Sequence, residues 1–144
     1  MLNSERKGES SHGEKVHRSR VLAAARRESS FDEERWSVEE VEKARKRLMS
    51  VEAMLSPVSE ANMTPFQKAS LEIEKIWLRF KTGKISGSER QSNLGRTLNY
   101  WETNNHEVFD QLTQENGDGI TLLAGIRNRV IPPINIGGFH TKRR

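Results

Sequence analysis

Three stretches of this sequence place apolar residues three or four positions apart, directly after residues that cap helices, and this pattern constrains the fold most. Ser37 and Glu40 make the first such start, a capping box in which each side chain bonds the backbone N–H of the other residue. The stripe that follows predicts a helix at about 38–55, ended by the proline at position 57. Its apolar members are Val41, Ala44, Leu48, Val51 and Leu55.

The second stretch begins at Thr64, with proline next to it and glutamine at position 67 to complete a capping box. It predicts a helix at about 65–82, with Gly83 where a left-handed C-cap is expected. Leu71 and Leu78 lie opposite the main apolar stripe of this helix. Such a two-sided helix is either central in its bundle or presents one side to a partner, so both leucines are candidate partner-binding residues. The main stripe comprises Phe66, Ala69, Ile73, Ile76, Trp77 and Phe80.

The third stretch predicts a helix at about 88–115, started by Ser86 with Glu89 or by Ser88 with Gln91. Asn105 interrupts its apolar stripe, within a run of poor helix formers at 103–106, so a break is expected as much as one continuous helix. Turn-forming residues at 116–119 end it. The stripe comprises Leu94, Leu98, Trp101, Val108, Phe109 and Leu112.

The two ends of the chain differ from this helical body. Hydrophobic residues make up 33% of the chain and charged residues 31%, so part of it is not expected to pack. We expect residues 1–36 to be a disordered charged arm, except that 21–27 has good helix propensity. Residues 117–144 are expected to form a short helix, ended by prolines, and then an extended basic tail. The predicted fold class is all-α: a bundle of three or four helices with a body at 37–116.

The net charge of +4 belongs to the ends of the chain. Residues 36–119 carry 11 basic and 13 acidic side chains, whereas 120–144 carry five basic and none acidic. Basic clusters in both arms are candidates for contacts with nucleic-acid phosphates. These nucleic-acid-binding candidates are Lys15, Arg18, Arg20, Arg26, Arg27, Lys142, Arg143 and Arg144.

Several short motifs resemble known binding or catalytic sites but lack residues that those sites require at fixed positions. The absence of cysteine excludes disulfides and thiolate sites. The Asn-Gly-Asp-Gly run at 116–119 lacks the glutamate that an EF-hand needs, since the twelfth position is Gly125. Gly83-Lys84 lacks the earlier glycine of a phosphate loop, because position 78 is leucine. His106 and Glu102 are four residues apart, but this spacing is common among solvated side chains on a helix surface. We therefore predict no catalytic residues, no metal and no cofactor.

The favoured function is a non-enzymatic interaction or scaffold subunit of a nucleoprotein or regulatory assembly. Helix faces and the apolar C-terminal tail would bind other protein subunits, and the seam of the first helix allows self-association. An RNA- or DNA-binding accessory factor and an enzyme with an unrecognised site are the alternatives. The tail adds four partner-binding candidates: Ile131, Ile134, Ile136 and Phe139.

Regulation and location are further expectations. Ser29 follows two arginines and Ser30 precedes an acidic block, so both are candidate phosphorylation sites between opposite charges. The longest apolar run, 21–25, is far shorter than the roughly 20 residues that cross a bilayer, so no membrane association is expected. The basic clusters also fit import signals, which favours an intracellular protein, nuclear rather than cytoplasmic.

Overall fold

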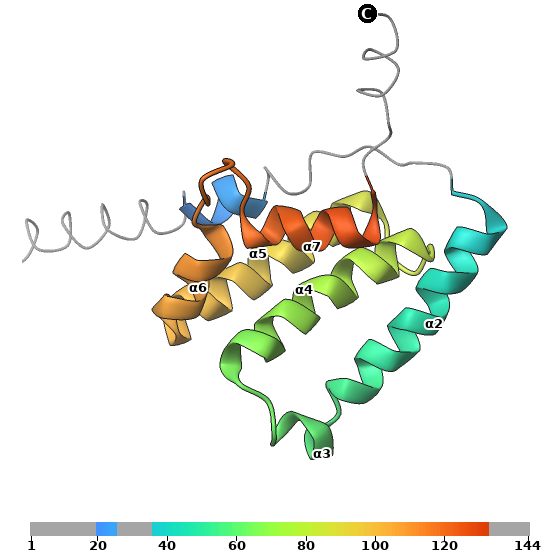
Figure 1. Cartoon of the computed structure of the whole chain (residues 1–144), viewed down its shortest axis with the longest axis horizontal. Coiled ribbons are helices and arrows are strands. Elements are labelled where there is room, and N and C mark those ends of the chain that lie inside the picture. The colour runs from blue at the N-terminus through green and yellow to red at the C-terminus, as the bar shows by residue number, and fades with distance from the viewer. Residues whose placement is uncertain (1–19, 26–35, 133–144) are drawn as a thin grey trace, which may run out of the picture.

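The computed structural model describes residues 20–25 and 36–132, and these residues form an all-α structure without strands (Figure 1). This confirms the predicted fold class. A helical segment at 20–25 precedes six helices. These are α2 (Val38–Met54), α3 (Pro57–Glu60), α4 (Pro65–Lys81), α5 (Gly87–Asn104), α6 (His106–Thr113) and α7 (Leu122–Val130).

Helix α4 is the centre of the bundle. It packs against α2, α5, α6 and α7, and Figure 1 shows α2, α4 and α5 running in alternating directions with α7 beside α4. The short α3 lies in the connection at one end. The helix predicted to have two apolar sides, because of Leu71 and Leu78, is therefore central in the bundle. This was one of the two interpretations of its pattern.

Helix starts follow the predicted capping residues. Ser37 Oγ accepts the backbone N–H of Glu40 at 3.1 Å, while the glutamate accepts the N–H of Ser37 at 3.2 Å. Thr64 and Gln67 make the same reciprocal pair. At α5 the box uses Ser86 with Glu89, which decides between the two predicted starts. Because each box satisfies backbone donors at a helix start, these boundaries are set locally.

The third predicted helix is divided in two at Asn105. This residue ends α5 and caps α6, with φ −153° and its side chain accepting the N–H of Val108 at 3.3 Å. The chain changes direction here, so α6 packs beside α5 and reaches α7. The prediction of a continuous helix at 88–115 is wrong, and the alternative of a break is what the chain adopts.

The packed body is larger than the predicted 37–116. Val21, Ala24 and Ala25 of the segment at 20–25 are buried in the core, so this part of the expected arm is ordered against the body. Helix α7 and the residue that follows it add four buried residues at the other end, because the apolar face of α7 covers α4 and α6. They are Leu123, Ile126, Val130 and Ile131.

Two predicted partner-binding residues are core residues instead. Leu78 is 3% exposed, because α2 and α7 pack against α4, and Ile131, which directly follows α7, is 1% exposed within the same core. Leu71 is partly buried against the core. The α2 seam predicted for self-association packs within the chain, since Leu48 and Val51 are fully buried against α4. In the described part of the chain, each helix is too short or too polar to traverse a lipid bilayer.

Candidate functional site

An open groove of about 690 Å³ runs between α4 and α5. On α4, residues spaced by four, three and four positions share one face and form one wall. On α5, a run with the same kind of spacing forms the opposite wall. The α4 wall consists of Lys68, Glu72, Lys75, Ile76 and Arg79, and the α5 wall of Asn93, Arg96, Thr97 and Tyr100.

The groove has an apolar base beneath polar edges. Ile76 is 7% exposed, and Leu55 at the end of α2 is partly buried beside the core. Tyr100 is 49% exposed, and its ring meets that of Trp101 edge-on at 5.2 Å between centroids. An aromatic ring held this way offers apolar area and a hydroxyl to a bound molecule.

Four cationic side chains and one carboxylate line this groove. The carboxylate, on Glu72, accepts the indole N–H of Trp101 at 2.8 Å. Arg79 lies 3.9 Å from Glu52, a contact of exposed groups that is weak in water. Lys75 makes no ion pair within residues 20–25 and 36–132. The groove is therefore basic although the body is slightly acidic.

A second hollow of about 470 Å³ continues the groove towards the loop before α4. Lys68 and Tyr100 line both hollows, so these two side chains stand between them. The far side is formed by Pro57 and Met63, near the α5–α6 junction at Asn105. Together the hollows make one elongated surface rather than an enclosed cavity.

A third hollow, of about 390 Å³, lies among α2, α4 and α7. Glu74 is buried here and accepts two bonds from Arg47, at 2.7 and 3.0 Å, with Arg129 at 3.4 Å. These hydrogen bonds raise the pKa of Arg47. Lys81 donates to the carbonyl of Val130 at 2.8 Å, and burial lowers its pKa. Because these polar groups bond to one another, we infer that they have a structural role and hold α2, α4 and α7 together.

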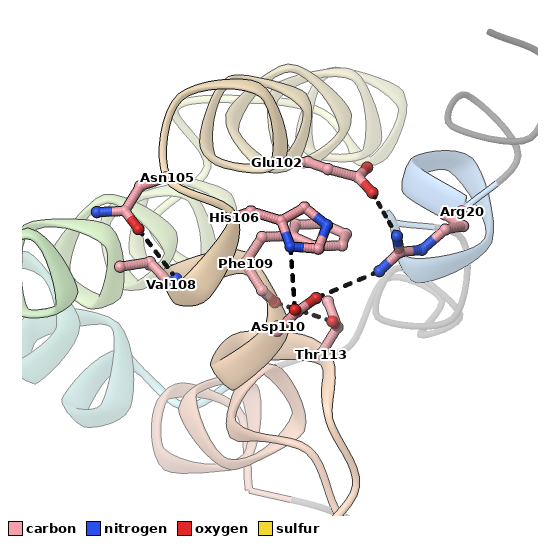
Figure 2. Close-up of polar contacts among 8 residues, drawn as sticks. All are labelled: Arg20, Glu102, Asn105, His106, Val108, Phe109, Asp110 and Thr113. Atoms are coloured by element: carbon pink, nitrogen blue, oxygen red, sulfur yellow. Dashed lines mark hydrogen bonds and ion pairs between the residues drawn. The ribbon is translucent and has the colours of Figure 1, made fainter. Parts of the chain in front are cut away.

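A cluster of charged groups joins the segment at 20–25 to the α5–α6 junction (Figure 2). Arg20 lies 2.9 Å from Glu102 and 3.4 Å from Asp110, and its guanidinium lies 5.2 Å from the centre of the Phe109 ring. His106 Nδ1 is 3.1 Å from Asp110. The histidine therefore pairs with the aspartate, not with Glu102 as its helical spacing suggested.

Most predicted nucleic-acid and phosphorylation residues lie outside the described residues. Arg20 is the exception, and its guanidinium is engaged with carboxylates of the body. The other basic candidates lie outside the described residues: Lys15, Arg18, Arg26, Arg27, Lys142, Arg143 and Arg144. The candidate phosphorylation sites Ser29 and Ser30 and the tail residues Ile134, Ile136 and Phe139 also lie outside them.

The groove was not predicted from the sequence, although its signal was present. The cations at 68, 75 and 79 repeat at helical spacing on α4. The net charge of residues 36–119 does not reveal them, because thirteen acidic side chains outnumber eleven basic ones in this range. Tyr100 and Arg96, four residues apart on α5, both line the groove.

Within residues 20–25 and 36–132, no group of three or more histidine or acidic side chains is arranged to hold a metal ion. Comparison of the chain with protein-family models, with curated proteins and with solved structures found no match.

Proposed function

We propose that this chain is a non-enzymatic interaction subunit, a helical body that binds a partner protein within a larger nucleoprotein or regulatory assembly. The observation that carries the proposal is the elongated, open groove on α4 and α5. Both helices bury their apolar residues inside the bundle, so the groove is a surface added to a body whose core is already complete.

The shape of the groove favours binding a chain over catalysis. Sites for small substrates are usually enclosed and gather titratable groups around a reacting atom. This groove is open, and its walls carry long cationic side chains with a tyrosine between them. The histidine–aspartate pair of His106 and Asp110 lies elsewhere, with both side chains about half exposed to solvent.

Affinity purification of the full chain from its native host, with and without nuclease, tests this proposal. We expect a protein to co-purify in stoichiometric amount and to remain after nuclease treatment. Exchanging Lys75 and Arg96 for glutamate should release it, whereas the same exchanges at Lys46 and Lys84, outside the groove, should not. A chain that purifies alone as a monomer contradicts the proposal.

Direct binding of RNA or DNA by the basic arms is the competing proposal, and it would go with a nuclear location. It predicts association that is lost after nuclease and affinity that falls steeply with salt. Arg20 does not support it, because that guanidinium is paired with Glu102 and Asp110. Absence of binding to single- or double-stranded oligonucleotides at low salt would dispose of this alternative.

A further inference from the structure

We infer that the groove between α4 and α5 binds an acidic peptide segment that also carries apolar side chains. This inference rests on the proposed function and names the chemistry of the partner. The occupant is a segment of another protein, and charge complementarity is the reason for choosing it.

The cations of the groove are placed to meet a row of carboxylates. On α4, at 1.5 Å per residue, Lys68 and Lys75 are about 10 Å apart along the helix axis, and Arg79 is about 6 Å further. Arg96 faces them from α5. Alternate residues of an extended peptide are about 7 Å apart, so acidic side chains at every second position come within reach of these long, flexible lysine and arginine side chains.

The base of the groove selects for apolar side chains in the same segment. Ile76, Leu55 and the ring of Tyr100 give apolar contact area between the cationic walls. In an extended peptide successive side chains point to opposite sides, so the acidic row would need apolar residues between its members. Binding then combines burial of apolar area with charge pairing, as in other grooves that take a peptide.

The small number of aromatic side chains disfavours a nucleic acid strand in this groove. Strand-binding surfaces stack successive bases on several aromatics. Tyr100 is the one aromatic side chain among the described residues that line the groove, and it is about half exposed.

Fluorescence anisotropy with labelled synthetic probes and the full chain tests the inference. The first probe is a short peptide alternating aspartate or glutamate with leucine or phenylalanine. The others are the same peptide with serine at the apolar positions, one with lysine at the acidic positions, and an oligouridylate. We expect the first probe to bind most tightly, and the serine probe about tenfold more weakly, a difference of about 1.4 kcal/mol.

Variants locate the binding. Exchanging Lys75 and Arg96 together for glutamate should weaken the first probe at least about tenfold. The pair Lys46→Glu and Lys84→Glu makes the same change in net charge outside the groove and should leave its binding unchanged. Amide chemical-shift changes in the wild-type chain should centre on 68–79 and 93–100, a readout that requires no variant to fold.

Equal binding of the serine probe would overturn the role of the apolar base. Preference for oligouridylate, or shift changes away from the groove, would overturn the inference as a whole. These failures are separate from failure of the proposed function. If the acidic peptide does not bind while a partner protein still co-purifies after nuclease, the subunit role stands and the partner uses another surface.

Discussion

The guanidinium of Arg20 lies 2.9 Å from the carboxylate of Glu102, a side chain that is 3% exposed at the end of α5. This ion pair ties a segment from the N-terminal side of the chain to the junction of α5 and α6. It stands beside the apolar contacts of Val21, Ala24 and Ala25, which are buried in the same core.

The first prediction concerns this tie. Replacing Arg20 with alanine removes one charged partner of the buried Glu102 carboxylate, and we expect the free energy of unfolding to fall by about 1–2 kcal/mol, less than for a fully buried pair because Arg20 is half exposed. Hydrogen exchange at 20–25 should speed up. As a control, Arg45→Ala removes an exposed pair with Glu42 and should change stability by under about 0.5 kcal/mol. Equal losses of stability for Arg20→Ala and Arg45→Ala would contradict a stabilising role for the Arg20–Glu102 ion pair.

The second prediction concerns Glu74, which joins three helices. Arg47→Ala removes both of its bonds to this buried carboxylate, which keeps its longer contact with Arg129 among the described residues. We expect a loss of about 2 kcal/mol in urea unfolding, because a charge stays buried with one weaker partner. Lys46→Ala, one position away on the exposed face of α2, should have an effect within about 0.5 kcal/mol. Were the two substitutions equivalent, the buried pair would not stabilise the bundle.

The third prediction is a dependence of stability on pH through Lys81. Burial lowers the pKa of this amine below its ordinary 10.5, an effect that Lys43 strengthens and Glu40 opposes. Between the folded pKa and 10.5 the unfolded chain binds more protons than the folded chain, so this group's contribution to stability rises with pH.

Paired unfolding curves measure this contribution. The free energy of unfolding of the wild type relative to Lys81→Met should increase as the pH goes from about 7 toward the ordinary lysine value. A difference that stays constant over this pH range would mean that the pKa of Lys81 is not lowered by burial.

The fourth prediction compares alanine substitutions at two glycines. Gly83 has φ +79° after α4, a conformation that side chains rarely adopt, so Gly83→Ala should lower the free energy of unfolding by about 1 kcal/mol. Gly95 lies within α5 with open space around it, so Gly95→Ala should raise that free energy by about 0.5–1 kcal/mol. Thermal unfolding of both variants checks the opposite signs, and two changes of the same sign would contradict the assignment of Gly83.

Local features of the sequence predicted the helices well where capping was explicit. Ser37, Thr64 and Ser86 each begin a helix through bonds to residues three positions later, which require no tertiary contact. The apolar stripes also placed Leu48, Trp77 and Leu98 in the core correctly. Asn105 indicated a possible break in the third predicted helix. Its role as the N-cap of α6 was not predicted, because it depends on the change of direction that brings α6 against α7.

The errors concern which apolar surfaces are covered. Leu78 and Ile131 were predicted to contact a partner, yet both are buried in the core, Leu78 on the central helix α4 and Ile131 directly after α7. Periodicity shows that a face is apolar without showing what lies against it, because the covering residues are far away in the chain. The groove was missed for the same reason, since its two walls come from α4 and α5 and only meet after folding.

The sequence by itself therefore determined the helical class, the starts of α2, α4 and α5 and the turn at Gly83, all set by interactions within a few residues. The tertiary structure decided that 20–25 and α7 belong to the body, that α4 is central and that Lys75 and Arg96 share one groove. The physical reason is that burial and ion pairing depend on which surfaces meet, and that depends on how the whole chain packs.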